Sequence, residues 1–336
     1  MYHCQYRYFS DFRQFRNLAL EENMAEVILF GEPMAMFVAQ SEGDLADVEN
    51  FVKLLAGAEV NVAIGLKRLG HSVSYITKLG KDPFGRYIEK KLRKEGIDPE
   101  ISYDAEHWTG FQMKSRVSEG DPEVVYFRKN SAASHITAED IEKVNLDGAK
   151  VLHVTGIPPA LSADCRKATY RLIERARENG LMVSFDPNLR PSLWENEETM
   201  IQVVNDLASR ADLVLPGTGE GKTLMRSSDP AAIADFYLKN GAKTVIVKDG
   251  PRGAYVAEGD RNFIRPGYPV AEVVDTVGAG DGFAVGVLSG YLEGLSLEKM
   301  ADRGNAIGAI QVSVQSDNEG LPTREELKKF QEVNRR

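Results

Sequence analysis

The sequence predicts an α/β protein with a mainly parallel, doubly wound sheet and a small β-strand excursion. Short apolar runs of strand length alternate with longer segments whose apolar residues recur at helical spacing. The alternation is broken once, by two strand-like runs that are joined by turn residues. With 336 residues, of which 43% are hydrophobic and 27% are charged, the chain is large enough to bury the core of such a sheet.

The first part of the chain establishes the alternation of strand and helix. Residues 27–31 (VILFG) form a short apolar run that ends in glycine, and the apolar residues of 59–69 recur at helical spacing. Residues 72–79 return to a strand pattern. Pro83 begins the next helical segment and Gly96 ends it, which follows the preference for proline at the first helical position and for glycine after the last.

An antiparallel hairpin is predicted where the alternation breaks. The strand-like runs 109–118 and 123–128 flank the turn residues Glu119-Gly120-Asp121-Pro122. Antiparallel strands that leave a doubly wound sheet are suited to covering an open crevice, so we expect a lid here. A decorative insertion is the alternative.

The alternation resumes after the hairpin and continues to the end of the chain. Strands are predicted near 150–154, 181–185, 211–215 and 243–247, with further strand-like runs at 254–257 and 262–265. Helices are predicted near 281–293, 297–313 and 323–333.

The first 23 residues differ from the rest of the chain. They lack the continuous apolar stretch and the small-residue cleavage site of a secretory signal. A strand pattern begins directly after Met24. We therefore expect residues 1–23 to be a poorly ordered extension of one domain at 24–336.

Composition and charge disfavour several classes of function. The formal net charge of −9 opposes non-specific binding to nucleic acid or anionic lipid. No apolar run approaches the roughly 18 residues of a membrane span. Cys4 and Cys165, the two cysteines, have no partner at zinc-ligand spacing. We expect a cytoplasmic protein whose partner is a small molecule, with no nucleic acid and no membrane.

The stretch DTVGAGDGF (275–283) carries the strongest chemical signal. A strand-like run precedes its glycines and an apolar helix pattern follows them, so a helix begins here. The free N–H groups and positive dipole end of a helix bind anions, and residues without bulky side chains let a phosphate approach the backbone. Gly278, Ala279 and Gly280 are therefore the predicted anion hole.

Asp281 directly follows this anion hole and is the predicted catalytic base. A Rossmann dinucleotide site is disfavoured because Phe283 stands where the pattern G-x-G-x-x-G needs its third glycine, and because an aspartate would repel a pyrophosphate. An aspartate fits if it accepts the proton of a hydroxyl that attacks the γ-phosphate of ATP. The alternative is a helix N-terminal acid, which is favourable by only ~0.3–1 kcal/mol.

A second glycine-rich segment, GTGEGKT (217–223), imitates a P-loop. The P-loop pattern needs glycine five positions before Gly221, and Pro216 stands there without the N–H that would bind a phosphate. We therefore predict no P-loop. Glu220 is assigned a milder role, to hold Mg²⁺ through water near the phosphates.

The stretch at 275–283 resembles the second signature of the ribokinase-like carbohydrate kinases, the phosphofructokinase-B type. GAEVNVA (57–63), followed by Leu69-Gly70, resembles the first signature of that family, and KLGKDPFG (78–85) resembles its usual continuation. The likeness spans residues 24–336.

This resemblance implies a ribokinase-like three-layer α/β/α sandwich with a small β-strand lid. The lid is expected mainly at about 101–130 and in part of 32–57. The resemblance also implies that Gly57 and Asn61 line the sugar pocket.

Within the family, the chain is most similar to kinases of 2-keto-3-deoxygluconate, a sugar acid. The similar motifs are GEPM (31–34), GAE (57–59), YFRK (126–129), DPNLR (186–190) and DNEG (317–320). A substrate carboxylate calls for guanidinium groups, because an arginine fork holds a carboxylate through two hydrogen bonds. Arg128 and Arg190 are assigned to it, with structural ion pairs as the alternative. Tyr126 and Asp317 are also assigned to substrate binding, as is Gln112, which stands where some relatives have tyrosine.

The nucleotide side is assigned by likeness alone. VKDGPRG (247–253) resembles the family's strand-turn segment beside ATP, which assigns Lys248, Gly250 and Gly253 to the nucleotide. Asn305 resembles the asparagine on the adenine side. Turn glycines and a solvated lysine are the alternatives. Gly217 stands where the family commonly has asparagine, three residues before Glu220.

These assignments predict a kinase that uses ATP and Mg²⁺, with a monovalent cation as a further candidate, and that phosphorylates the 6-hydroxyl of 2-keto-3-deoxygluconate. A fructokinase or ribokinase-type kinase of a neutral sugar is the first alternative. A non-catalytic sugar-acid sensor is the second, and a proton acceptor at the phosphate site disfavours it. Exposed lid strands and the family likeness predict a homodimer or higher homo-oligomer.

Overall fold

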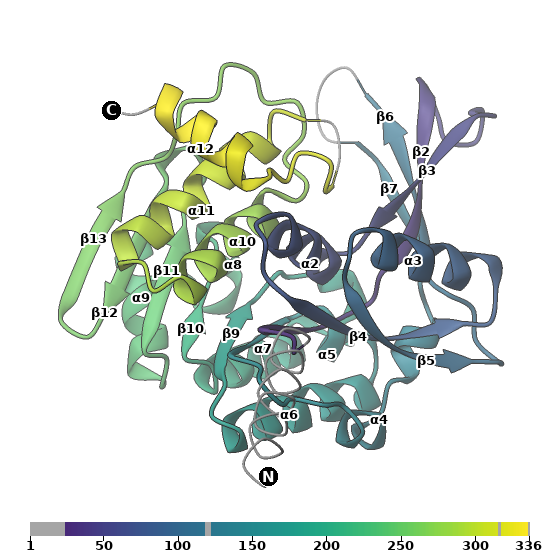
Figure 1. Cartoon of the computed structure of the whole chain (residues 1–336), viewed down its shortest axis with the longest axis horizontal. Helices are drawn as coiled ribbons and strands as arrows, with labels where there is room; N and C mark the ends of the chain where they lie inside the picture. Colours follow the sequence, from purple (N-terminus) through teal and green to yellow (C-terminus); the bar gives the residue numbers. More distant parts are fainter. Residues whose placement is uncertain (1–23, 118–121, 315–316, 335–336) are drawn as a thin grey trace, which may run out of the picture.

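The computed structural model describes residues 24–117, 122–314 and 317–334 (Figure 1). Its main sheet has nine strands in the order β13-β12-β11-β10-β9-β8-β1-β4-β5. Their bounds are β1 Val27–Phe30, β4 Val73–Gly80, β5 Asp98–Asp104, β8 Val151–Thr155, β9 Met182–Asp186, β10 Leu213–Val214, β11 Thr244–Lys248, β12 Ala254–Glu258 and β13 Arg261–Arg265. The strands from β11 to β5 pair in parallel, and the two pairings of β12, with β11 and with β13, are antiparallel. The predicted mainly parallel sheet is confirmed.

Helices cover both faces of this sheet, which confirms the three-layer sandwich. One face carries α2 (Ala58–Arg68), α3 (Pro83–Lys94), α10 (Ala279–Leu292), α11 (Leu297–Gln311) and α12 (Arg324–Val333). The other carries α6 (Ala163–Glu178), α7 (Glu197–Ser209), α8 (Thr218–Leu224) and α9 (Pro230–Lys239), with the short helices α4 (Ala138–Glu142) and α5 (Pro158–Leu161) nearby.

The central strand β1 shows why this sequence forms a buried strand. Val27 and Leu29 pack into the core with α2 and α10, whereas Ile28 and Phe30 pack into the core with α6 and α7. Side chains alternate between the faces of a sheet, so a strand covered on both faces is apolar throughout.

A second, four-stranded sheet has the order β3-β2-β6-β7 and lies beyond α2 and α3 in Figure 1. Its strands are β2 (Met34–Glu42), β3 (Phe51–Ala56), β6 (Phe111–Arg116) and β7 (Val124–Phe127). The antiparallel pairing of β6 with β7 confirms the hairpin, and β2 pairs with β6 in parallel. The hairpin is thus half of a larger sheet.

The lid segment needs one correction. Residues 101–104, which were assigned to it, belong to β5 and pair with β4 at the edge of the main sheet. These residues are largely polar, so they do not show the apolar pattern of a buried strand. An edge strand can be polar because its outer side faces solvent.

The extension at 1–23 and turn residues 119–121 lie outside the described residues. Assembly into a homodimer or higher homo-oligomer stays a prediction, and β3 and β7 are the edge strands of the second sheet. Within the described ranges, no helix has the length and apolar character needed to cross a membrane.

Candidate active site

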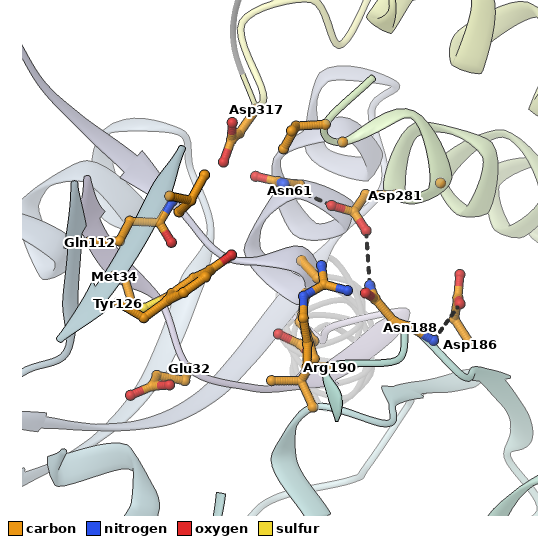
Figure 2. Close-up of a pocket in the computed structure, with 18 of the residues that line it drawn as sticks. Glu32, Met34, Asn61, Gln112, Tyr126, Asp186, Asn188, Arg190, Asp281 and Asp317 are labelled. Atoms are coloured by element: carbon orange, nitrogen blue, oxygen red, sulfur yellow. Dashed lines mark hydrogen bonds between the residues drawn. The ribbon is translucent and has the colours of Figure 1, made fainter. Parts of the chain in front are cut away.

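A polar cavity of about 310 Å³ lies between the two sheets (Figure 2). Glu32, Asp186 and Lys248 line it at or just after the carboxyl ends of β1, β9 and β11, and Gln112 and Tyr126 line it from the second sheet. In open α/β sheets, ligands bind outside the carboxyl ends of the strands. The cavity brings together twelve residues that the sequence predicts: Gly57, Asn61, Gln112, Tyr126, Arg128, Arg190, Glu220, Lys248, Gly278, Gly280, Asp281 and Asp317.

Asp281 is a buried carboxyl group in the first turn of α10. The Asn61 side-chain amide donates to its Oδ2 at 2.8 Å, and the Asn188 amide donates to its Oδ1 at 3.4 Å (Figure 2). Burial raises the pKa of Asp281 to about 6, with a smaller contribution from Asp186, and the hydrogen bond from Asn61 opposes the shift. The group is poised to exchange a proton near neutral pH.

This pKa predicts an acidic limb in the pH profile of kcat/KM. A general base must be ionised, so the rate should fall about tenfold for each pH unit below about pH 6. The hydrogen bond from Asn61 lowers the pKa of Asp281, so Asn61→Ala should move the limb to higher pH. Steady-state kinetics across pH measure this, with Asn145→Ala, an exposed loop variant, as the control. If Asn61→Ala had its acidic limb at the same pH as the wild type, this would contradict the assignment of Asp281 as the base.

The loop before α10 depends on glycine at Gly278. This residue has a left-handed φ of 79°, and an added Cβ would lie 2.5 Å from the carbonyl oxygen of Asp317. An added Cβ at Gly280 would meet the Nζ of Lys248 at an ordinary 3.5 Å. Gly278 is therefore required by the backbone, whereas Gly280 leaves space open beside a cation.

The two glycines should respond differently to alanine. Gly278→Ala should lower the free energy of unfolding by about 1–2 kcal/mol, because an L-residue is strained in the left-handed region. Gly280→Ala should keep its stability and raise the KM for ATP, because the methyl group fills the proposed anion hole. Thermal unfolding and ATP kinetics on both variants measure this. An unchanged KM for ATP in Gly280→Ala would remove that residue from the nucleotide site.

The two arginines that were assigned to the substrate differ in their partners. Arg128 is buried and paired with Glu32, whose Oε2 accepts from its Nε at 2.7 Å and lies 2.5 Å from its Nη2. Arg190 donates from Nη1 to the carbonyl of Leu189 at 2.9 Å and forms no ion pair within the described part of the chain. Figure 2 shows the Arg190 side chain pointing toward the space beside Asp281. Arg190 is therefore the guanidinium available to a ligand anion.

Other residues assigned to the substrate surround the same space. Gly57 has a φ of 136°, and an added Cβ would lie 2.9 Å from the carbonyl oxygen of Glu32. The amide nitrogen of Gln112 lies 3.1 Å from the sulfur of Met36. Tyr126 is 43% exposed, and the guanidinium of Arg128 lies 5.6 Å from the centre of its ring.

Lys248 is partly buried beside two carboxyl groups. Its Nζ donates to Asp186 Oδ2 at 2.6 Å. Burial opposes the charged form, but Asp186 and Glu220 outweigh burial and raise the pKa of Lys248. The oxygens of Glu220 accept from the backbone N–H groups of Gly217 at 2.6 Å and Leu189 at 3.1 Å. Lys248 therefore stays protonated, and its ammonium is paired with Asp186.

The P-loop imitation forms the short helix α8, capped at Gly217 by Glu220. Lys222 is exposed on this helix and does not line the polar cavity. Phosphate binding through that lysine therefore has no support.

A second cavity, of about 660 Å³ and largely apolar, adjoins the first. Gly250, Gly253, Ala279 and Asn305 line it. The side-chain amide of Asn305 donates to the carbonyls of Arg265 at 3.0 Å and Pro266 at 3.1 Å, which fixes the segment after β13. All the residues assigned to the nucleotide side thus line one cavity.

The two cavities meet at Lys248, Thr276 and Gly280, which line both. Asp281 lines the polar cavity beside this junction. The polar cavity and the apolar cavity thus share a wall. This wall carries the ammonium of Lys248 and Gly280 at the start of α10. Such a pair of cavities suits two substrates that exchange an anionic group.

Sequence reasoning missed several charged residues of the polar cavity, among them Lys114 and Glu59. Burial raises the pKa of Glu59 to about 7, and the hydroxyl of Thr155 donates to one of its oxygens. Lys114 follows Gln112 by two residues on the same strand, so the period of two places both on one face. That spacing is the signal that would have identified Lys114.

Comparison with known proteins gives consistent matches. Residues 24–324 match the family described as pfkB family carbohydrate kinase. The chain is 50% identical over 307 residues to the 2-dehydro-3-deoxygluconokinase of Bacillus subtilis (strain 168), covering 91% of this chain and 95% of that relative. The crystal structure of a PfkB protein from Polaromonas sp. JS666 superposes with a TM-score of 0.84 and 46% identity, over 91% of this chain and 99% of that chain. An E. coli structure in complex with ATP and Mg²⁺ has a TM-score of 0.83 and 26% identity, over 92% of this chain and 100% of that chain.

Proposed function

The chain belongs to the pfkB family of carbohydrate kinases, and on this premise we propose that it phosphorylates 2-keto-3-deoxygluconate, also called 2-dehydro-3-deoxygluconate. In this proposal the γ-phosphate of ATP goes to the 6-hydroxyl of the sugar acid. The observation that carries it is the junction of the two cavities at Lys248, Thr276 and Gly280, beside Asp281. The apolar cavity takes the nucleotide, and the polar cavity takes the sugar acid.

Asp281 acts as the general base in this reaction. As the 6-hydroxyl oxygen forms its bond to the γ-phosphorus, the bond from that phosphorus to the β,γ-bridging oxygen breaks, and the bridging electrons leave with ADP. The hydroxyl proton passes to the Asp281 carboxylate. The pKa of about 6 supports this role, because the group is largely ionised at neutral pH and still basic enough to accept a proton.

The anion hole stabilises the transferring group. It consists of the N–H groups at the start of α10, from Gly278 to Gly280, together with the ammonium of Lys248. Mg²⁺ would neutralise charge between the β- and γ-phosphates. Within the described ranges, no group of three or more His, Cys, Asp or Glu side chains is arranged to hold a metal. Asp186 and Glu220 are the carboxylates that we assign to that water shell.

Arg190 supports an acidic substrate. Its guanidinium lines the polar cavity without an ion-pair partner in the described part of the chain, so a substrate carboxylate can take that place. Glu32 and Tyr126 hold Arg128 in a fixed orientation, and Arg128 contributes with its remaining N–H groups. We propose that the second sheet acts as a lid that excludes water from the reaction.

A neutral-sugar kinase is the second candidate, and one carboxyl group in the lining of the polar cavity supports it. Glu59 has a buried oxygen, Oε2, with no hydrogen-bond partner in the described part of the chain, so it could accept from a sugar hydroxyl, whereas Glu32 is paired with Arg128 and Asp317 with Lys114.

The position of the transferred phosphate tests the proposal. The protein is incubated with ATP, Mg²⁺ and 2-keto-3-deoxygluconate, and the product is identified by phosphorus and proton NMR. We expect one phosphate, coupled to the C6 methylene protons, for each ADP formed. A phosphate at another carbon, or ADP formed without a phosphorylated acid, would contradict it.

A further inference from the structure

Lys114 joins the second sheet to the loop that precedes the anion hole. It lies on β6 and is buried, with 4% of its surface exposed. Its Nζ donates to Asp275 Oδ2 at 2.6 Å and to Asp317 Oδ1 at 3.2 Å. Both carboxylates are buried, so all three charges are shielded from water.

The two carboxylates flank the loop that leads into α10. The other oxygen of Asp275, Oδ1, accepts from the backbone N–H of Val277 at 3.0 Å. Gly278 packs so closely on the carbonyl of Asp317 that a Cβ would meet it at 2.5 Å. The ammonium of Lys114 therefore holds both sides of the loop that carries the anion hole.

We propose that Lys114 is a positioning residue that couples the second sheet to the anion hole, with its ammonium as a built-in cation that fixes the loop at 275–278. It contacts the loop through Asp275 and Asp317 and needs no contact with the transferring phosphate. Movement of β6 thereby changes the orientation of the N–H groups at the start of α10. The role rests on the proposed phosphoryl transfer and is independent of which sugar accepts the phosphate.

The charges around Lys114 explain why the cation is needed. Burial alone would favour a neutral amine, but Asp317 and Asp275 outweigh burial and raise the pKa of Lys114. Without the ammonium, two buried carboxylates would face each other, and one buried charge without a partner is already costly. The loop would then move, or one of the two carboxylates would take up a proton. Either change would disturb the anion hole.

Kinetics of Lys114→Met and Lys114→Ala test this role, with whichever acceptor the wild-type protein phosphorylates. We expect kcat to fall by about 10²-fold, the scale for misplacement of reacting groups by about 1 Å. The KM for the acceptor should change less than kcat. Ammonium or methylammonium should restore part of the kcat of Lys114→Ala, because a small cation fits the space that alanine leaves. Tetramethylammonium at the same ionic strength should not, because it is too large.

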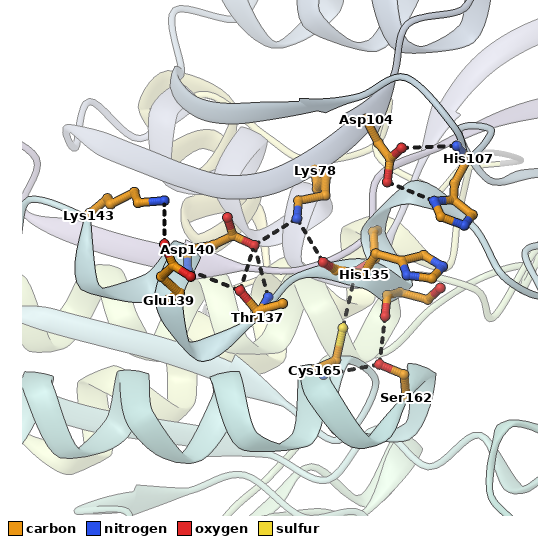
Figure 3. A network of polar contacts seen from close by, with 12 residues as sticks. Lys78, Asp104, His107, His135, Thr137, Glu139, Asp140, Lys143, Ser162 and Cys165 are labelled. Carbon is orange, nitrogen blue, oxygen red and sulfur yellow. Dashed lines mark hydrogen bonds and ion pairs between the residues drawn. The ribbon is translucent and has the colours of Figure 1, made fainter.

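Lys78→Met is the matched control. Lys78 is also shielded, with 14% of its side chain exposed, and its Nζ donates at 2.7 Å to Asp140 Oδ2 and to the carbonyl of His135 (Figure 3). It does not line the polar cavity. This variant should lose stability while its kcat stays near that of the wild type and does not respond to ammonium.

Asp275→Asn provides a second variant that keeps the side-chain shape. It retains an oxygen for the N–H of Val277 but weakens the contact with Lys114, so kcat should fall as in Lys114→Met. Three results would each overturn the proposal. The first is a kcat near the wild-type value in folded Lys114 variants, and the second is a loss of kcat that only follows the fall in Tm. The third is a folded Lys114→Ala variant whose kcat does not rise with ammonium. A wild-type protein that transfers phosphate only to a neutral sugar would reject the substrate assignment and leave this test intact.

Discussion

Asp281→Asn is expected to lower kcat by about 10²–10⁴-fold, with little change in the affinity for ATP. Asparagine keeps the shape of the side chain and an oxygen for the Asn61 amide but cannot accept the hydroxyl proton at neutral pH. The nucleotide is assigned to the adjoining cavity, which Asp281 does not line, so ATP binding should be retained. Single-turnover phosphoryl transfer and direct ATP titration measure the two effects separately.

Asp206→Asn is the matched control for this experiment. Asp206 lies on α7, pairs with Arg210 at 3.1 Å and does not line the polar cavity. It should retain normal turnover. Turnover near the wild-type value in Asp281→Asn would remove Asp281 from the mechanism, whatever the identity of the acceptor.

Arg190→Ala should lower kcat/KM for the sugar acid by about 10²–10³-fold, since loss of one partner of a buried hydrogen-bonded charge pair costs several kcal/mol. Neutral sugars should be affected much less. Arg190 forms no ion pair in the described part of the chain, so its removal breaks no salt bridge and Tm should hold. Initial rates with 2-keto-3-deoxygluconate and with fructose measure how much kcat/KM the variant loses for each acceptor.

Arg166→Ala is the control for loss of an arginine outside the cavity. Arg166 pairs with Glu195 at 3.0 Å and lies over the ring of Trp194. An equal loss for acidic and neutral acceptors in Arg190→Ala would contradict the carboxylate assignment and would indicate a contact with the transferring phosphate.

The main sheet and the position of the anion hole follow from local patterns in the sequence. A buried parallel strand is a continuous apolar run, as at β1, and glycines before an apolar helix mark a phosphate site. The P-loop was rejected because of Pro216 alone. The short helix α8, on which Lys222 is exposed, agrees with that rejection.

Pairings between distant segments were not predictable from the sequence. The Glu32 partner of Arg128 lies 96 residues away, so nothing local distinguishes this engaged arginine from the available Arg190. β2 and β3 were not identified as strands, because only the second sheet as a whole gives their mixed residues a buried face. The period of two places Lys114 on the same strand face as Gln112, but its pairing with Asp275 and Asp317, which lie 161 and 203 residues away, cannot be read from the sequence.

The most direct test of the central claim compares acceptors for the purified protein with ATP and Mg²⁺. The initial rate of ADP release is measured with 2-keto-3-deoxygluconate, fructose and ribose at equal concentration. We expect a strong preference for the sugar acid, and Arg190→Ala should abolish it. A preference for fructose or ribose would contradict the proposed substrate, and tight binding of the sugar acid without ADP release would contradict phosphoryl transfer itself.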